Sequence, residues 1–262
     1  MSILEGFALT GYGAVVTGSG QGIGRGIALG LAEAGADLVI TARRADDLAE
    51  TARLIEAAGR RAVVVVGDIR DAGINERLAD AAVATFGRLD VWVNNVGGSD
   101  EKATRLLIDT PDDVWRSQLE LNLTVAFVGL KAAASRMTNG GCIINIASGA
   151  GMRGSPRTGP YAAAKAAMLN LTSTAALELA PLIRVNAVSP GQVPTEAFRQ
   201  VLGMVDLTPL AEATPLRRLG TPQDIASAVV YLASPAGSWV TGENLLVAGG
   251  RRERGGSKER YG

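Results

Sequence analysis

Tyr161 and Lys165 are the two side chains whose types and spacing best suit proton transfer. Because they are four residues apart, they lie on one face if the Ala-rich stretch around them is a helix. A Lys ammonium near a phenol stabilises the phenolate, lowers the pKa of the Tyr and makes it a plausible acid/base. The alternative interpretation is a Tyr packed at the start of a helix and a Lys in solvent.

The sequence contains no His and a single Cys, Cys142. These counts exclude Ser-His-Asp triads, Cys-His pairs, His-ligated metals, Cys-rich zinc sites and an internal disulfide. We therefore expect no metal site. Proton chemistry must rely on Tyr, Lys, Asp, Glu or hydroxyl groups.

Ser148 directly follows an Ile-rich run, 142–147, that predicts a strand. Parallel α/β sheets place their sites at the carboxyl ends of strands, and the segment up to Tyr161 is long enough for a return loop. A lone Ser in such a place is usually a cap or turn residue. Together with Tyr161 and Lys165, however, Ser148 is predicted to be catalytic.

A Gly-rich segment, 17–24, lies between a predicted strand and a predicted helix. Glycines allow the backbone to turn tightly and to approach a pyrophosphate, and the following helix N-terminus offers free N–H groups. The alternative is a purely structural Gly turn. The strand before and the helix after the segment favour phosphate binding.

Two arginines, Arg43 and Arg44, follow Ala42 at the end of the second predicted strand. In dinucleotide-binding folds a carboxylate at this point bonds the 2′-hydroxyl of NAD, whereas Arg accommodates the 2′-phosphate of NADP. Cations at a helix start are otherwise unfavourable, which supports the phosphate interpretation. Asp46 and Asp47 follow at once and weaken it, and the alternative is a pair of solvated surface arginines.

Short β-branched runs alternate with Ala/Leu-rich stretches along the whole chain. The strand runs are almost continuously apolar, which is typical of strands buried on both faces. This alternation predicts an α/β fold, a doubly wound parallel sheet of about seven strands with helices on both faces. We expect one domain over 1–250 and a polar, mobile tail over 251–262. The predicted strands are 13–17, 37–41, 62–66, 89–94, 142–147, 183–188 and 244–247, and the predicted helices are 23–34, 45–58, 72–86, 112–137, 161–179 and 222–233.

The composition is that of an ordinary globular protein: 47% of the 262 residues are apolar and 20% are charged. The 26 basic and 26 acidic residues balance, so there is no broad field to attract nucleic acid or an anionic membrane. The first residues do not read as a signal peptide, and no apolar run approaches the roughly 18 residues that span a bilayer. A cytoplasmic protein is expected.

With these motifs in place, the chain resembles the short-chain dehydrogenase/reductase family over about 6–250. The segment 17–24, TGSGQGIG, matches the family's TGxxxGxG, and 94–97, NNVG, matches its NNAG with Val for Ala. Asn122, Ser148, Tyr161 and Lys165 match the catalytic Asn-Ser-Tyr-Lys tetrad in order and spacing. The segment 184–191 matches the one that leads to the nicotinamide. The region 215–239 is similar to bacterial hydroxysteroid dehydrogenases and to 3-oxoacyl-carrier-protein reductases.

The resemblance implies a Rossmann-type fold and a role for each matching residue. Tyr161 would be the acid/base, Lys165 would lower its pKa and hold the nicotinamide ribose, Ser148 would bond the substrate carbonyl, and Asn122 would hold a water. Two departures stand out: Gln21 is not basic, and Ala248 stands where the family usually has Asp. The residues expected around the cofactor are Gly18, Ser19, Gln21, Gly22, Ile23, Gly24, Arg43, Arg44, Asp68, Ile69, Asn95, Val96, Gly97, Tyr161, Lys165, Pro190, Gly191, Val193 and Thr195.

The implied function is hydride transfer between NADP(H), favoured over NAD(H), and a carbonyl or secondary alcohol. A small, hydrophobic, steroid-like ketone is favoured because an apolar segment follows Gly191, although that segment could equally be an ordinary amphipathic helix. The alternatives are a 3-oxoacyl-carrier-protein reductase, which would need a basic entrance near Arg153 and Arg157, and a non-catalytic cofactor sensor. The apolar residues of this segment are Phe198, Val201, Leu202, Met204, Val205 and Leu207.

The helix that carries Tyr161 also predicts self-association. Its Ala/Leu-rich surface and that of the helix predicted over 112–137 are too apolar to remain in water. Relatives commonly pair these helices across a two-fold axis. We therefore expect a homotetramer, or failing that a dimer, with closed symmetry.

Overall fold

The computed structural model describes residues 2–99, 104–196, 198 and 206–250. Its centre is one parallel sheet of seven strands in the order β3-β2-β1-β4-β5-β6-β7. Every neighbouring pair is parallel, which confirms the doubly wound fold predicted from the strand–helix alternation. The strands are β1 (Gly13–Thr17), β2 (Asp37–Ala42), β3 (Ala62–Val66), β4 (Val91–Asn94), β5 (Gly141–Ile146), β6 (Ile183–Pro190) and β7 (Asn244–Val247).

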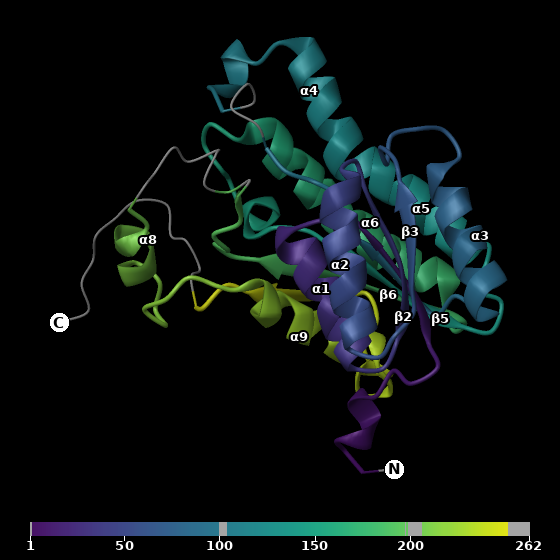
Figure 1. The fold of residues 1–262 in the computed structure, drawn as a ribbon. Helices are drawn as coiled ribbons and strands as arrows, with labels where there is room; N and C mark the ends of the chain where they lie inside the picture. Colours follow the sequence, from purple (N-terminus) through teal and green to yellow (C-terminus); the bar gives the residue numbers. More distant parts are fainter. Residues whose placement is uncertain (1, 100–103, 197, 199–205, 251–262) are drawn as a thin grey trace.

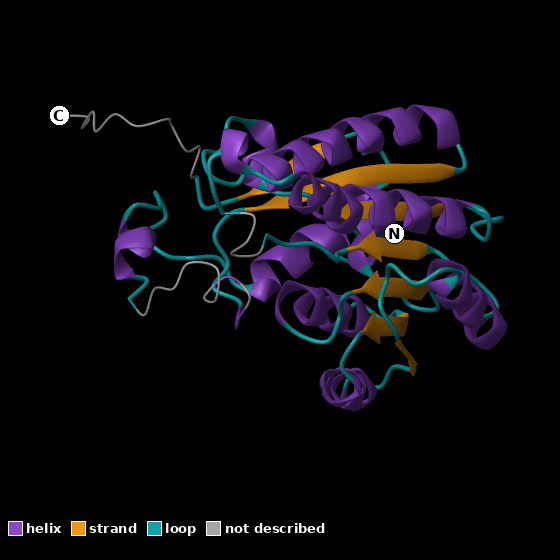
Figure 2. Ribbon diagram, turned by 90° about the horizontal axis from the view of Figure 1, so that it is seen from above, coloured by secondary structure: helices purple, strands orange, loops and turns teal. Residues whose placement is uncertain are grey.

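Helices cover both faces of this sheet (Figures 1 and 2). The helices are α1 (Gly22–Glu33), α2 (Ala45–Ala57), α3 (Ile74–Phe86), α4 (Asp112–Leu119), α5 (Val125–Ala134), α6 (Gly159–Leu179), α8 (Thr208–Glu212) and α9 (Pro222–Ala233). Alternate residues of β1 point to opposite faces: Val16 belongs to an apolar cluster with residues of α1, α2 and α9, whereas Val15 belongs to a cluster with residues of α3, α5 and α6.

The edge strand β3 differs from the expectation that the strands are buried on both faces. Val64 and Val66 are 42% and 48% exposed. Their apolar side chains do not reveal this, because β-branched residues are also favoured at a sheet edge. By contrast, all five residues of the inner strand β1 are buried.

The long helix expected over 112–137 is interrupted. A five-residue π-helical turn, η4 (Glu120–Thr124), separates α4 from α5, and α5 ends at Ala134. Asn122 lies in the middle of this turn with its side chain buried. π-Helical turns are rare and occur frequently at functional sites, and this one carries a residue that the sequence had singled out.

The order of the sheet reverses between β1 and β4. Segments leave the carboxyl ends of these two strands toward opposite sides, which opens a crevice where α/β folds bind ligands. Most of the expected site residues follow the carboxyl ends of β1, β4, β5 and β6, while Tyr161 and Lys165 lie on α6 and the expected adenosine contacts follow β2 and β3. Among the described residues, no helix combines the length and apolar character needed to cross a membrane.

Candidate active site

A cleft of about 570 Å³ lies at the carboxyl ends of these strands. Its volume is within the range of small-molecule and cofactor sites. It brings together most of the residues expected from the sequence, although they are spread over about 180 positions of the chain. Those that line it are Gly18, Gln21, Gly22, Ile23, Gly24, Asn95, Gly97, Ser148, Tyr161, Lys165, Pro190, Gly191, Val193 and Thr195.

The Gly-rich turn fits the pyrophosphate group expected there. Gly22 has a φ of +56°, and α1 begins at this residue with no side-chain cap from the described part of the chain. A β-carbon at Gly24 would lie 2.1 Å from the carbonyl oxygen of Gly18, so the turn can close only with glycine there. The uncapped N–H groups of the first turn of α1 border the cleft, where they suit an anion.

Asn95 fixes the position of this turn. Its Nδ2 atom donates hydrogen bonds to the carbonyl oxygens of Thr17 (2.9 Å) and Gly18 (3.2 Å), and its backbone N–H donates to Thr17 Oγ1 (3.0 Å). The loop after β4 is thereby tied to the loop after β1 across the crevice. Val96 lies beside Gly18 but does not line the cleft.

Ser19 differs from the expectation that it lines the phosphate site. Its side chain is fully buried, and its hydroxyl accepts a hydrogen bond from the backbone N–H of Thr41 at 3.1 Å. The Ser19 N–H is also engaged, with the carbonyl oxygen of Thr41. The structure therefore uses Ser19 to fasten the turn to β2, and it does not border the cleft.

Arg43 and Arg44 lie exposed just beyond the end of β2. Arg44 pairs with Asp47 and donates to Gln21 Oε1 at 3.0 Å; the hydrogen bond and charge of Asp47 raise the pKa of Arg44. Asp68 and buried Ile69 follow β3 nearby. The pKa of Asp68 falls to about 2, mainly through its hydrogen bond with Arg70 and in small part through the charge of Arg43. Of these residues only Gln21 lines the cleft; Arg43, Arg44, Asp68 and Ile69 do not.

Ser148, Tyr161 and Lys165 meet inside the cleft. The hydroxyl groups of Ser148 and Tyr161 lie close enough for Ser148 to affect the pKa of Tyr161, and the Ser148 oxygen accepts a hydrogen bond from the N–H of Ala150 at 3.1 Å. Lys165 Nζ donates to the carbonyl oxygen of Ile146 at 2.8 Å and lies 5.9 Å from the centre of the Tyr161 ring. Two hydroxyl groups and an ammonium group thus share one small volume.

The pKa values of the pair depend mainly on burial. Burial raises the pKa of Tyr161, and the nearby hydroxyl of Ser148 offsets part of this rise. Burial also lowers the pKa of Lys165 to about 7. The sequence predicted a lowered pKa for Tyr161. In the structure it is raised, because the phenol is desolvated while Lys165 faces the ring.

Asn122 holds the loop after β4 in place through its side-chain hydrogen bonds. Gly98 N–H donates to its Oδ1 atom at 2.8 Å, and its Nδ2 atom donates to the carbonyl oxygens of Gly98 (3.0 Å) and Gln118 (3.1 Å). A β-carbon at Gly97 would lie 2.7 Å from Asn122 Oδ1 and 2.9 Å from Lys165 Nζ. The loop after β4 is therefore held tightly between Asn122 and Lys165.

Known proteins resemble this chain over nearly its full length. A family model described as enoyl-(acyl carrier protein) reductase matches residues 18–252. An uncharacterized oxidoreductase of Mycobacterium tuberculosis is 44% identical and covers 95% of both chains. A 3-oxoacyl-[acyl-carrier-protein] reductase of Synechocystis is 36% identical, over 93% of this chain and 98% of that protein. The solved structure of a 7α-hydroxysteroid dehydrogenase complexed with NADH and 7-oxo glycochenodeoxycholic acid has a TM-score of 0.89 and 36% identity, over 95% and 98% of the two chains.

The chain belongs to the short-chain dehydrogenase/reductase family. As a member, it is an oxidoreductase that acts on alcohol and carbonyl groups. The family binds NAD(P)(H), and the uncapped start of α1 beside the cleft fits the phosphates of such a cofactor. The resemblance seen in the sequence is thereby confirmed at the level of family, fold and reaction class.

The sequence missed a chain of buried polar side chains that joins the elements of this dehydrogenase/reductase site. Trp92 Nε1 donates to Asn94 Oδ1 (2.7 Å), Asn94 Nδ2 donates to Asn145 Oδ1 (2.9 Å), and Asn145 Nδ2 donates to Thr172 Oγ1 (2.9 Å). This series of hydrogen bonds links β4 to β5 and β5 to α6. Two asparagines inside otherwise apolar strands were the signal that could have revealed it.

Other residues of the cleft were missed or only partly expected. Phe198 lines the cleft as expected, and so does Arg153, whereas Arg157 does not; Val201, Leu202, Met204 and Val205 lie outside the described residues. Most of the missed lining residues are polar, so the cleft has both polar and apolar walls. Lining residues for which no role was predicted include Ser99, Ser155, Thr158, Gln192 and Ala248.

Proposed function

We propose that this chain is an NADP(H)-dependent oxidoreductase that interconverts a ketone and a secondary alcohol on a largely hydrophobic small molecule, with Tyr161 as the acid/base. The observation that supports this most strongly is that Tyr161, Ser148 and Lys165 converge in one cleft, with Lys165 Nζ 5.9 Å from the centre of the Tyr161 ring. When bound, NADP(H) supplies or accepts the hydride.

In the direction of reduction, Tyr161 donates its proton to the carbonyl oxygen of the substrate. Ser148 donates a hydrogen bond to the same oxygen, and the pair positions the carbonyl group. The developing phenolate is stabilised by Lys165, which would also hold the nicotinamide ribose. The side chain of Asn122 is fully engaged with Gly98 and Gln118, so we assign it the positioning of the loop around Gly97.

NADP(H) is proposed over NAD(H) because the last residue of β2 carries no carboxylate. Ala42 ends this strand, and the exposed guanidinium groups of Arg43 and Arg44 follow. A 2′-phosphate would exchange the contact of Arg44 with Asp47 for a stronger one with a dianion. A carboxylate at position 42, by contrast, would repel the phosphate and bond a free 2′-hydroxyl.

The variant Tyr161→Phe tests the assignment, with Tyr231→Phe as the matched control. Tyr231 packs against Phe7 away from the cleft. We expect kcat of Tyr161→Phe to fall about 100-fold or more, while NADPH binding, followed by fluorescence, stays near that of the wild type. Wild-type kcat in Tyr161→Phe on any accepted substrate would show that another group transfers the proton.

The alternatives are separated in the same assay by a panel of substrates with NADPH. A ketone panel with steroid and monocyclic members tests the proposed function. Preference for an acyl thioester would support a 3-oxoacyl-carrier-protein reductase, for which Arg153 places a basic group at the cleft. Tight NADPH binding without turnover of any member would support a cofactor sensor.

A further inference from the structure

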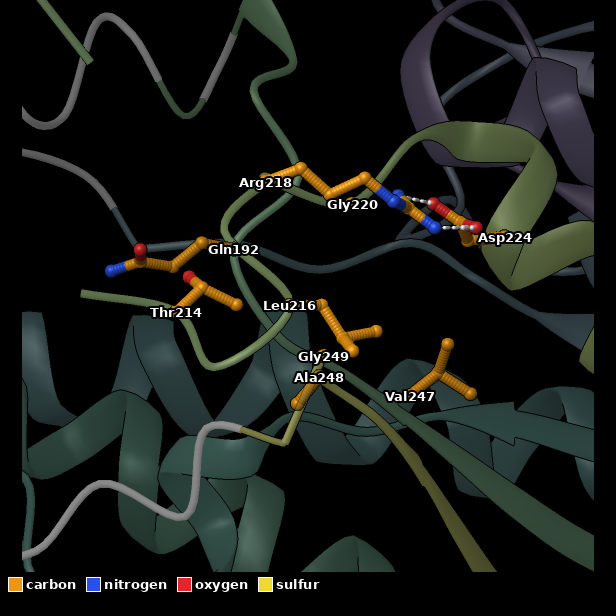
Figure 3. Close-up of a pocket in the computed structure, with 9 residues that line it drawn as sticks. All are labelled: Gln192, Thr214, Leu216, Arg218, Gly220, Asp224, Val247, Ala248 and Gly249. Atoms are coloured by element: carbon orange, nitrogen blue, oxygen red, sulfur yellow. Dashed lines mark hydrogen bonds and ion pairs between the residues drawn. The ribbon is translucent and has the colours of Figure 1, made fainter. Parts of the chain in front are cut away.

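A second cavity adjoins the active-site cleft. This side pocket has a volume of about 160 Å³ and lies between the segment after β6, the segment between α8 and α9, and the end of β7 (Figure 3). A single water needs only about 10–15 Å³ by a comparable measure, so a substituent of several heavy atoms fits. The side pocket is lined by Gln192, Thr214, Leu216, Arg218, Val247 and Ala248, among others.

Gln192 and Ala248 border both the side pocket and the cleft. They therefore stand where the two cavities meet. Gly191 packs against Ala248 so closely that a β-carbon there would lie 2.7 Å from the Ala248 Cα atom. The backbone at this junction has little room to move, so the size of the side chain at position 248 determines how wide the passage is.

The charged residues of the side pocket neutralise each other. Arg218 donates two hydrogen bonds to Asp224, at 2.6 Å and 2.8 Å, and Figure 3 shows this pair joined by its two dashed contacts. Asp224 also completes the capping box of α9 with Thr221, which holds it in place. Because both ions are paired with each other, the side pocket favours a neutral ligand over an anion.

Most of the remaining lining is apolar, but one polar group lacks a partner. Leu216, Val247 and Ala248 present hydrocarbon, and the hydroxyl of Thr214 is used in a bond to the carbonyl oxygen of Leu210 (2.9 Å). The Oε1 atom of Gln192 is buried and has no hydrogen-bond partner among the described residues. A buried polar atom without a partner is costly, and a half-turn of the carboxamide that brings this oxygen to the cavity would let a ligand supply the partner.

We propose that the side pocket binds a short, neutral, hydroxyl-bearing arm of the substrate, with Gln192 as the residue that recognises the hydroxyl group and Ala248 as the residue that keeps the passage open. A hydroxyl group can donate and accept, so it satisfies the carboxamide of Gln192 in either orientation of the amide. The substrate class is then a hydroxylated ketone with an apolar body. This inference rests on the proposed function and refines its substrate.

The test compares three ketones reduced with NADPH: cyclohexanone, 4-ethylcyclohexanone and 4-(hydroxymethyl)cyclohexanone. The last two have arms of equal length and differ in one hydroxyl group. We expect the wild type to favour the hydroxymethyl ketone over the ethyl ketone by about tenfold in kcat/KM. Gln192→Leu should bring this ratio close to one, whereas Gln223→Leu, which alters an exposed Gln on α9, should leave it unchanged.

Ala248→Leu probes the passage independently. It should lower kcat/KM about tenfold or more for both ketones that carry an arm and several-fold less for cyclohexanone, while Ala57→Leu at the exposed end of α2 changes none of the three. If Gln192→Leu keeps the wild-type preference, or if Ala248→Leu slows all three ketones equally, the side pocket does not bind the arm.

A binding measurement distinguishes failure of this inference from failure of the proposed function. Saturation-transfer NMR with 4-(hydroxymethyl)cyclohexanol needs no turnover. Contact signals from the hydroxymethyl protons in the wild type that are lost in Ala248→Leu would support the side pocket even if no ketone is reduced. Absence of those signals in the wild type would overturn it even if the ketones are reduced.

Discussion

Replacing Lys165 with Met should stabilise the cofactor-free protein while removing its activity. The Lys165 side chain is only 2% exposed, and burial is the one cause that lowers its pKa, to about 7 from 10.5. Methionine has a similar length and carries no charge, so it fits the same space without the cost of desolvating an ammonium group. We therefore expect Lys165→Met to unfold at a higher temperature than the wild type near neutral pH.

The size of the effect follows from the pKa difference between the folded and unfolded states. One pKa unit corresponds to about 1.4 kcal/mol, so a fall of about 3.5 units disfavours the folded wild type by about 5 kcal/mol below pH 7. The variant also loses the hydrogen bond to the Ile146 carbonyl oxygen, which reduces this gain in stability by about 1–2 kcal/mol. The net gain is about 3 kcal/mol, or about 6–12 °C in Tm for a chain of this size.

The same two pKa values of Lys165, about 7 when folded and 10.5 when unfolded, determine how the stability changes with pH. Between pH 7 and 10.5 the unfolded state binds a proton at Lys165 that the folded state does not, so the stability of the wild type rises with pH over this window. The advantage of Lys165→Met should therefore be full at pH 6.5 and close to zero at pH 9.5.

Thermal unfolding of cofactor-free protein at these two pH values, at one scan rate, provides the measurement. Lys131→Met is the control, because Lys131 is exposed on α5 near Phe127. It should change the Tm little, without a pH trend. A Tm for Lys165→Met at or below that of the wild type at pH 6.5, or a difference that is the same at both pH values, would refute the reasoning.

Three further predictions concern the cofactor, the interior and the assembly. The double variant Arg43→Ala/Arg44→Ala should weaken NADPH binding about 10- to 150-fold and NADH binding little, and equal dissociation constants of the wild type for the two cofactors in a fluorescence titration would exclude the 2′-phosphate role. Thr172→Val leaves the Asn145 amide without its partner and should lower the urea unfolding free energy by about 1–3 kcal/mol, whereas Thr172→Ser should cost less; equal losses would contradict the role of the hydroxyl. Light scattering at micromolar concentration should give about four times the chain mass of 27.0 kDa, since α6 exposes apolar surface such as Leu177 at 83%, and a clean monomer peak would rule out the assembly.

The sequence predicted most of the fold because the signals were local. Apolar β-branched runs, separated by stretches of helical length, are enough to locate the strands and helices of a doubly wound sheet, and the ends agree within a few residues. The break at η4 could not be predicted in this way. It depends on hydrogen bonds between Asn122 and Gly98, 24 residues apart, and no pattern within 112–137 records them.

The candidate site was predictable where a motif carries its own geometry. Tyr161 and Lys165 on one helix, and the glycines before α1, needed only local spacing. Ser19 shows the limit of this reasoning. The motif places it in the turn, but its hydroxyl accepts a hydrogen bond from the N–H of Thr41, which lies on β2, 22 residues further along the chain. The side pocket at Gln192 was not predictable, because its walls come from segments that only the tertiary fold brings together.

Buried polar groups link the stability of this protein to its proposed chemistry. Asn94, Asn145 and Thr172 replace apolar packing with hydrogen bonds, and in return they tie β4, β5 and α6 together directly beneath the loops that carry the site. Each of these hydrogen bonds is directional, so it fixes how far one element is shifted along the other, which apolar contacts do not. Lys165 is the extreme case, because its desolvation has no compensating carboxylate among the causes of its lowered pKa. An ammonium group kept at this cost beside Tyr161 is understandable if a phenolate must form there, since that is the state in which the charge of Lys165 is finally compensated.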